Sequence, residues 1–441
     1  MTDLARRLGV FDGTMIVMGG IIGAGIFISP YVVARYVHTP ALILGVWVAG
    51  GAIALLGAFV YAELAAIKPG VGGVYAYLRD AFHPMVAFLF GWTLLLVVNA
   101  GGMAAVAVTF GLYLRDLTGI ALEPATIAVI ALAALTIINC YGVRAGASVQ
   151  NTFMVLKIVA IAALITIGWI AVGRASASPP PAAAATGSPT GFAAAMVPVL
   201  FAYGGWQTAT FVSEEMRDPQ RDLPRALLWG ITGVLLLYLA ANLVYVLVLT
   251  PSGLAATTTP ASEVMRRAIG EPGARFIALG ITISTVGFLS QGMLTGPRVY
   301  FAMARDGVFF ARVGWLHPRS RAPVYAIALQ GVWAAAVAMS GRYEQILNYV
   351  VAIDAIFFGL TGAALIVFRR RQRVDVTARG HLRTPGHPWT TMLFVGAFWI
   401  VALNTIVRFP RSAGIGVLVL LAGIPVYLWW ARRRVTDRPR S

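Results

Sequence analysis

The chain has 441 residues, of which 59% are hydrophobic and only 12% are charged, and its mean hydropathy is +0.79. A water-soluble domain of ordinary size cannot bury so much apolar surface, so the composition excludes an ordinary soluble enzyme and indicates that lipid is the main solvent. The single cysteine, Cys140, excludes intramolecular disulfides and a cysteine metal cluster.

Apolar stretches recur along the whole chain, and short polar loops separate them. A membrane-spanning helix needs roughly 20 mostly apolar residues. We therefore predict an all-α, polytopic membrane protein with twelve transmembrane helices, in which residues 1–441 form a single integral domain. The predicted spans are Met15–Tyr36, Ala41–Ile67, Met85–Leu114, Pro124–Tyr141, Ser148–Gly173, Phe192–Glu214, Ala226–Thr250, Arg275–Met303, Pro323–Ser340, Ile346–Phe368, Trp389–Phe409 and Gly414–Ala431. Between spans seven and eight, Ser262–Ile269 is predicted to form a short external helix.

Basic residues give the chain a net charge of +17, and they concentrate on one side of the predicted membrane. Of the 34 Lys and Arg residues, 23 fall on the side that holds both termini and 9 on the other, while Lys157 and Arg298 lie inside spans. Because cytoplasmic loops carry the excess of Lys and Arg, we predict the inner (cell) membrane with both termini cytoplasmic. Topology thus accounts for the charge, and no nucleic-acid partner is expected.

Two of the predicted spans are interrupted by glycine and proline. The first span contains Gly19, Gly20, Gly23 and Gly25, and the sixth contains Pro198, Gly204 and Gly205. These spans open two groups of five helices, at residues 12–173 and 192–370, and since five is odd the second group starts on the opposite side of the membrane. We therefore predict a 5+5 inverted repeat with broken helices one and six, plus two peripheral helices within residues 389–431.

The two interruptions predict a binding site made of main-chain groups. Small residues let the backbone leave the helix, which frees amide and carbonyl groups near the bilayer centre. The half-helix that restarts after the first break offers amides to a carboxylate, and carbonyls released before the breaks accept hydrogen bonds from an ammonium group. The predicted substrate-binding residues are Ile21, Gly23, Ala24, Gly25, Ile26, Phe201, Ala202 and Gly204. The alternative is an unbroken first span with a small-residue packing face, and the second interrupted span argues against it.

Two ionisable residues lie deep inside predicted spans. Lys157 is about 9 residues into span five, close to the middle of a ~30 Å hydrocarbon core. A central charge costs roughly 2.5–3.5 kcal/mol on insertion scales, so Lys157 should face the bundle and find acceptors. Asp354 is equally deep in span ten, where three roles stay open: pairing with a basic substrate, carrying a proton, or accepting a hydrogen bond while neutral.

Further charged residues gather at the predicted cytoplasmic ends of spans two, six and eight. They are either solvated charges at helix ends or an ion-pair latch that closes the inner mouth. The cluster consists of Glu63, Glu214, Glu215, Arg217, Asp218, Arg221, Arg298 and Arg305.

Several motifs together resemble those of a known family. They are Gly20-Ile-Ile-Gly-Ala-Gly-Ile-Phe27, Phe201-Ala-Tyr-Gly-Gly-Trp206, Glu215-Met-Arg-Asp-Pro-Gln-Arg-Asp-Leu-Pro-Arg225 and Arg383-Thr-Pro-Gly-His-Pro388. With these motifs the chain resembles the amino acid–polyamine–organocation superfamily, specifically its L-type amino acid transporter branch, over nearly its entire length.

The resemblance implies a fold of ten helices in two inverted repeats plus two peripheral helices, with the substrate held between helices one, three, six, eight and ten. It also implies that Phe201 is the aromatic gate above the substrate. Lys157 matches the fifth-helix lysine that stands where sodium-coupled relatives bind a cation, so it is the expected coupling residue. Animal members attach to a glycoprotein through a cysteine in the loop after span three, and because Leu114–Glu123 contains no cysteine, no disulfide-linked heavy chain is expected.

The predicted function is sodium-independent secondary transport of small neutral L-amino acids, by exchange and alternating access, without a metal or cofactor. The alternative is proton-coupled transport of cationic amino acids or polyamines, which Asp354 suggests. A membrane-embedded enzyme is disfavoured because no histidine lies at mid-span and no cysteine cluster exists. A channel or membrane sensor is a further alternative.

Overall fold

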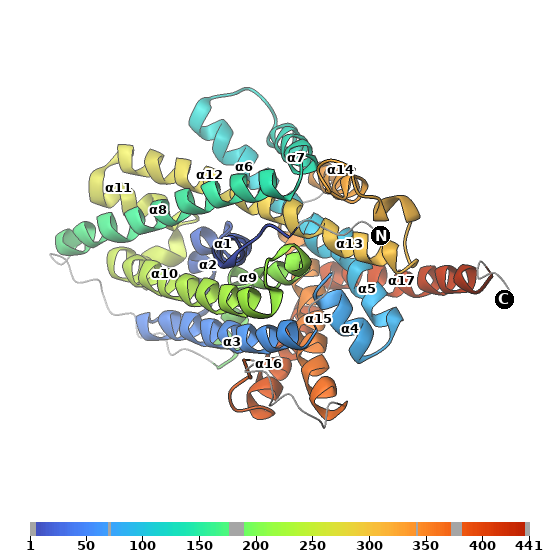
Figure 1. Cartoon of the computed structure of the whole chain (residues 1–441). Helices are drawn as coiled ribbons and strands as arrows, with labels where there is room; N and C mark the ends of the chain where they lie inside the picture. The colour runs from blue at the N-terminus through green and yellow to red at the C-terminus, as the bar shows by residue number, and fades with distance from the viewer. Residues whose placement is uncertain (1–5, 69–71, 176–188, 341–342, 372–381, 437–441) are drawn as a thin grey trace.

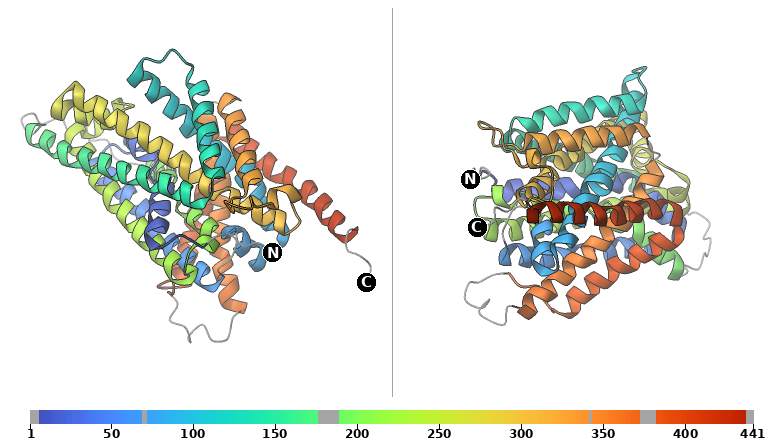
Figure 2. Two further views of the ribbon diagram at one scale, coloured as in Figure 1. Left: turned by 45° about the horizontal axis from the view of Figure 1, so that its top comes forward. Right: turned by 90° about the vertical axis from the view of Figure 1, so that its right-hand side faces the viewer.

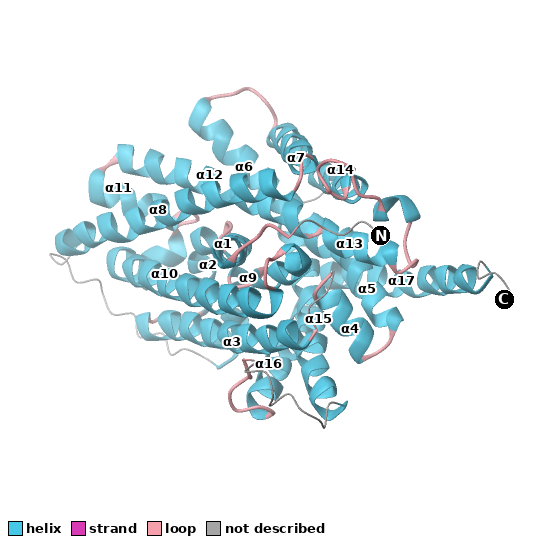
Figure 3. Ribbon diagram, in the orientation of Figure 1, coloured by secondary structure: helices cyan, strands magenta, loops and turns pink. Residues whose placement is uncertain are grey.

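The computed structural model describes residues 6–68, 72–175, 189–340, 343–371 and 382–436. Regular structure within these ranges is helical, as Figure 3 shows, and β pairing in them is limited to one isolated bridge between Leu8 and Met216. The prediction of an all-α protein is therefore confirmed.

Each predicted span contains helix, although several consist of more than one segment. The first part of the chain forms α1 (Val10–Ile21), α2 (Gly25–Tyr36), α3 (Pro40–Ile67), α4 (Val74–Ala81), α5 (Pro84–Thr93), the π-helix η1 (Leu94–Asn99), α6 (Ala100–Thr118), α7 (Pro124–Cys140) and α8 (Val143–Ala175). The remainder forms α9 (Pro189–Ala202), the 3₁₀ helix η2 (Trp206–Glu215), α10 (Pro219–Ala256), α11 (Pro260–Ile269), α12 (Glu271–Thr295), α13 (Pro297–Arg305), the 3₁₀ turn η3 (Ala311–Gly314), α14 (Val324–Ser340), α15 (Tyr343–Arg371), α16 (Trp389–Arg408) and α17 (Pro410–Thr436).

Nine helical segments in the described ranges are long and apolar enough to cross a membrane, and α7 and α14 are shorter apolar helices. The sixth predicted span is divided between α9 and η2, because the chain leaves helical geometry between Ala202 and Trp206. The number of twelve crossings and the inverted repeat stay predictions.

The short interrupted helices lie at the centre of the bundle. The long helix α10 runs beside α1 and α2, and α3 lies on the other side of α10 (Figure 1). α1 packs on α8, α10, η2 and α12, while α2 packs on α9 and α10. α17 lies at the edge against α5 and α15, and it extends away from its neighbours in both Figure 1 and Figure 2. The surrounding long helices therefore hold both interruptions in the interior.

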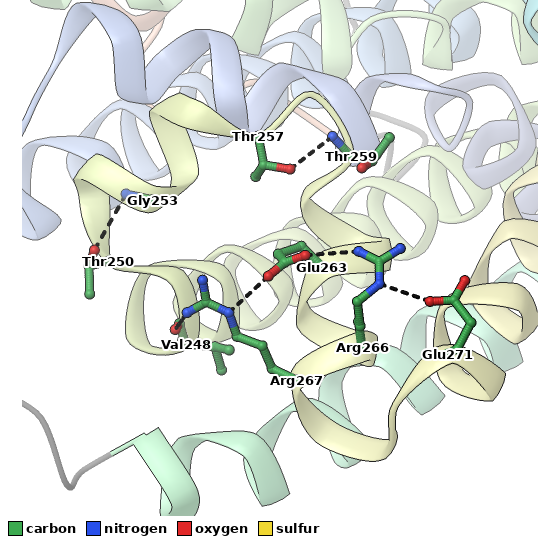
Figure 4. Close-up of polar contacts among 9 residues, drawn as sticks. All are labelled: Val248, Thr250, Gly253, Thr257, Thr259, Glu263, Arg266, Arg267 and Glu271. Atoms are coloured by element: carbon green, nitrogen blue, oxygen red, sulfur yellow. Dashed lines mark hydrogen bonds and ion pairs between the residues drawn. The ribbon is translucent and has the colours of Figure 1, made fainter.

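The predicted short helix between spans seven and eight is confirmed as α11. α10 contains a non-helical residue, Thr250, with φ 62° and ψ 161°. Arg267 on α11 donates from Nη1 to the carbonyl oxygen of Val248 at 2.9 Å, while its Nε pairs with Glu263. Figure 4 shows both contacts. This hydrogen bond joins α11 to a carbonyl oxygen close to the kink in α10.

Candidate functional site

The main chain leaves helical geometry at both predicted interruptions. α1 ends at Ile21, Ile22 is extended (φ −77°, ψ 92°), and α2 begins only at Gly25. In the second interruption α9 ends at Ala202 and η2 begins at Trp206, after Gly205 with φ 101°. Glycine adopts a positive φ at little steric cost, whereas other residues rarely do. The glycine at position 205 therefore favours the break.

The two interruptions touch each other through their backbones. A Cβ atom on Gly205 would collide with the carbonyl oxygen of Gly20, and one on Gly20 would collide with Gly205 in return. A Cβ atom on Gly25 would lie 2.9 Å from Cα of Ala202. Glycine at these three positions is therefore what allows the breaks to meet, and the site is assembled from segments about 180 residues apart in the chain.

The first break exposes a group of amide donors. The amides of Ala24, Gly25 and Ile26 have no acceptor among the described residues, because they precede the first complete turn of α2. Such amides stand at the positive end of the helix dipole, where an anion is stabilised. The amide of Gly23 is already occupied, since it donates to the carbonyl oxygen of Ile21 at 2.9 Å.

The carbonyl acceptors are only partly those predicted. The Ile21 oxygen accepts from Gly23 and, at 3.1 Å, from the hydroxyl of Tyr238, so both of its lone pairs are used. The Phe201 oxygen accepts from the amide of Gly204 at 3.0 Å and retains one lone pair. The carbonyls of Ala202 and Gly204 accept nothing from the part of the chain that the structure describes. The second break therefore supplies the free acceptors, and Ile21 is not available as one.

A central cavity of about 110 Å³ lies between the two breaks. Of the predicted binding residues, Ile21, Gly23, Ala24, Gly25, Phe201, Ala202 and Gly204 line it. Ile26 does not line it and is fully buried, so its side chain contributes to the core. The remaining walls come from η1, α6, η2, α12, α15 and α16. These elements belong to predicted spans three, six, eight, ten and eleven.

Phe201 lines both the central cavity and a larger one. The second cavity has a volume of about 550 Å³ and is lined by α2, α6, α9 and α16, together with Thr258 and Val351. Phe201, Gly25 and Val351 line both cavities. These three residues therefore lie where the two cavities adjoin.

Several polar cavity residues were not predicted. Asn99 is the last residue of the π-helix η1, and its Nδ2 donates to Oε1 of Gln330 at 2.9 Å. Gln291 on α12 donates to the hydroxyl of Thr208 on η2. Polar residues inside lipid-length spans are costly unless they face the bundle, which is a signal that identifies Asn99 and Gln291 from sequence. Phe288, which packs against Gly23, has no such signal.

Lys157 lies on α8 behind the first break and is fully buried. Its Nζ donates to the carbonyl oxygen of Ile22 and, at 3.4 Å, to that of Gly19. α12 leaves room for the side chain, because a Cβ atom on Gly287 would lie 2.6 Å from Cε of Lys157. The ammonium group thus faces the bundle, occupies carbonyls that the break has released, and does not line the cavity.

Asp354 lines the central cavity from α15, beside Val351, Ala355 and Phe358. It is the one charged residue among the described residues of that lining. Its carboxylate makes no hydrogen bond or ion pair within the described ranges. A carboxylate in such a place needs a proton or a cationic group on the ligand to offset its charge.

Two ion pairs between described residues involve members of the predicted charged cluster. Nε of Arg298 lies 2.7 Å from Oε1 of Glu215, and both side chains are 1% exposed. Glu63 accepts from Arg369 and from the amide of Thr384, each at 2.7 Å. Arg369 was not in the predicted cluster, and the predicted members Arg217, Asp218, Arg221 and Arg305 form no ion pair with any described residue.

Comparison with known proteins decides the family. The model of the family described as "Amino acid permease" matches residues 8–429. The chain belongs to the amino acid permease family. The resemblance to the amino acid–polyamine–organocation superfamily and its L-type branch is therefore confirmed. The protein is a multi-pass membrane transporter of amino acids and not an enzyme.

Relatives of this permease match most of its length. It is 31% identical to the human large neutral amino acids transporter small subunit 2 over 444 residues. This alignment covers 98% of the present chain and 82% of the relative. It is 32% identical over 375 residues to the rabbit b(0,+)-type amino acid transporter 1, covering 83% and 77%. It is 28% identical over 442 residues to the serine/threonine exchanger SteT of Bacillus subtilis, covering 98% of each chain.

Proposed function

We propose that this permease is a sodium-independent exchanger of small neutral L-amino acids that works by alternating access. The observation that carries the proposal is the pair of touching breaks, which offers free amides from one segment and free carbonyls from the other to one cavity. Those two sets of dipoles complement the carboxylate and the ammonium group of a zwitterion.

The substrate binds through its main-chain groups. The amides of Ala24 and Gly25, which line the cavity, receive the carboxylate, and the carbonyls of Ala202 and Gly204 accept from the ammonium group. Phe201 is the gate, because it lines both cavities. The backbone binds the carboxylate and the ammonium group that all amino acids share. The other residues that line the cavity therefore determine which substrate side chains are accepted.

The size of the central cavity supports a small substrate. One water molecule needs roughly 10–15 Å³ of such volume. A cavity of about 110 Å³ therefore matches a ligand with a handful of non-hydrogen atoms, such as alanine, serine or threonine. The name of the Bacillus subtilis relative, a serine/threonine exchanger, agrees with this substrate class.

Sodium independence is supported by Lys157. Its ammonium group binds the carbonyls of Ile22 and Gly19, which are the type of oxygen ligand that a sodium ion takes at a broken helix. A covalently attached cation there makes a bound sodium ion unnecessary. Lys157 is thus the proposed coupling residue.

We also propose the inner membrane, with both termini and the ion pairs of Glu215 and Glu63 on the cytoplasmic side, because the loops rich in Lys and Arg lie there. The second cavity then opens outward, and the ion pairs close the inner mouth. No disulfide-linked partner is proposed, since the loop at residues 119–123 contains no cysteine, although the human relative is named a small subunit.

Transport by purified protein in liposomes tests the proposal. Labelled alanine should enter liposomes loaded with unlabelled alanine at least about 10 times faster than empty ones, because exchange needs a substrate for the return step. Replacing a sodium gradient by choline should leave the rate unchanged. Uptake that requires inward sodium, or equal rates in loaded and empty liposomes, would show that sodium-independent exchange is wrong.

The unpaired carboxylate of Asp354 favours a second candidate function, the proton-coupled transport of a cationic amino acid or polyamine. The Asp354→Asn variant separates the two, because the amide keeps the shape and removes the charge. Under the leading proposal, alanine uptake stays within about twofold and arginine is not transported by either protein, since no countercharge is needed. Under the second candidate, wild type transports arginine and the variant loses it.

The comparison requires a matched control that removes a carboxylate elsewhere. Asp222 lies in the first turn of α10 and lines neither cavity, so Asp222→Asn should transport alanine and arginine as wild type does. Arginine uptake that follows Asp354 and not Asp222 would establish the second candidate and displace the first.

A further inference from the structure

The second cavity carries a charge pattern that the central site does not explain. Of the described residues that line it, two are charged, and both are arginines: Arg35 on α2 and Arg408 on α16. Neither makes an ion pair within the described residues. The described lining of the cavity is therefore positively charged. A cavity lined by positive charge attracts the anionic group of a ligand.

Stabilisation of the helix dipoles does not by itself explain why both arginines line the same cavity. Each lies in the last turn of its helix, where a cation interacts favourably with the dipole. That interaction acts on each helix separately and does not require both guanidinium groups to line one cavity. Arg35 also lies near an aromatic ring of the cavity, since its Cζ is 5.9 Å from the ring centroid of Tyr31.

The cavity also contains an acceptor for the other end of a zwitterion. Asn404 precedes Arg408 by one helical turn on α16, so the two side chains share a face, and both line the cavity. The amide of Asn404 makes no hydrogen bond with a described residue. A guanidinium group binds carboxylate oxygens and the Asn404 oxygen accepts from an ammonium group, so the set suits an amino acid.

We infer that the second cavity is a separate outer binding site, in which Arg35 and Arg408 hold the carboxylate of an incoming amino acid before it passes Phe201. The inference rests on the proposed function, because it takes the amino acid as the ligand and the second cavity as outward-facing. From this site the carboxylate moves past Gly25, which lines both cavities, to the free amides at the start of α2. The same two charges repel cationic side chains.

Transport kinetics test the outer site in variants that keep the central site intact. We expect Arg35→Gln and Arg408→Gln to raise KM for alanine roughly threefold to tenfold, with kcat unchanged, because exposed charges assist capture more than translocation. Raising ionic strength should raise KM in wild type and have little effect in the double variant, with sucrose as the osmotic control. Unlike Arg35→Gln, the Arg35→Lys variant should keep most of the salt dependence of wild type, since lysine retains the positive charge.

A matched control and a direct probe complete the test. Arg275 is exposed near the start of α12 and lines neither cavity, so Arg275→Gln should keep the KM and salt dependence of wild type. Propionate has a carboxylate but no ammonium group, so it should inhibit alanine uptake by wild type and not by the double variant, while ethylamine inhibits neither.

The outcomes separate this inference from the proposed function. If wild type takes up alanine but the double variant has the same KM, salt dependence and propionate inhibition, the outer site is wrong and the proposed function stands. If oleate inhibits far more strongly than propionate, and only when the arginines are present, the arginines bind lipid carboxylates and the inference is overturned. If wild type transports no amino acid under any gradient, the proposed function itself fails.

Discussion

The Lys157→Ala variant is expected to lose at least about 100-fold in the rate of amino acid uptake. The ammonium group donates to the carbonyls of Ile22 and Gly19, and alanine leaves both oxygens buried without a donor. Hydrogen bonds from a charged group contribute about 1.5–3 kcal/mol each, so loss of two corresponds to roughly 100-fold or more in the stability of the broken-helix conformation. A first segment without this anchor no longer presents its amides to the cavity.

Exchange of labelled alanine in liposomes measures the effect, with Lys157→Met as a second variant that keeps most of the side-chain volume. The chain has one other lysine, Lys68, whose side chain is 45% exposed and pairs with Asp80 at 3.4 Å. Lys68→Ala should therefore change the rate by less than about twofold, since exposed ion pairs contribute little. A well-folded Lys157→Ala protein that transports as wild type does, or strict sodium dependence in wild type, would refute the role assigned to Lys157.

The interruptions were predictable because their cause is local. Gly23, Gly25, Gly204 and Gly205 remove the side chains that stabilise a continuous helix, and unsatisfied backbone in lipid is tolerated only around a cavity. The buried position of Lys157 followed in the same way from the cost of a charge in lipid. Each of these features depends only on the type of one residue and on its position within an apolar span, and both can be read from the sequence.

The pairing of distant groups was not predictable, because it depends on packing. The carbonyl of Ile21 was expected to be free for a ligand, but the hydroxyl of Tyr238, 217 residues away, binds it. Glu63 was expected to belong to a cytoplasmic cluster, but its partner is Arg369, 306 residues away. The π-helix that places Asn99 on the cavity wall likewise has no pattern in the apolar run that forms it.

The pair of Arg298 and Glu215 yields the largest expected change in stability. Both side chains are 1% exposed, and the pair joins α13 to η2, directly after the second break. Removing one partner of a buried ion pair costs about 3–5 kcal/mol, because the other charge stays buried without compensation. Arg298→Met and Glu215→Leu should therefore each lower the apparent melting temperature in detergent by roughly 5–10 °C.

The double variant decides how the pair acts, since it removes both charges at once. Nη1 of Arg298 has no hydrogen-bond partner among the described residues, so the native pair is not fully satisfied. Apolar replacement of both residues should thus recover most of the lost melting temperature. Arg266→Met on α11, which breaks exposed pairs with Glu263 and Glu271, serves as the control and should shift it by less than about 2 °C. Single variants as stable as this control would show that the buried pair does not stabilise the folded protein.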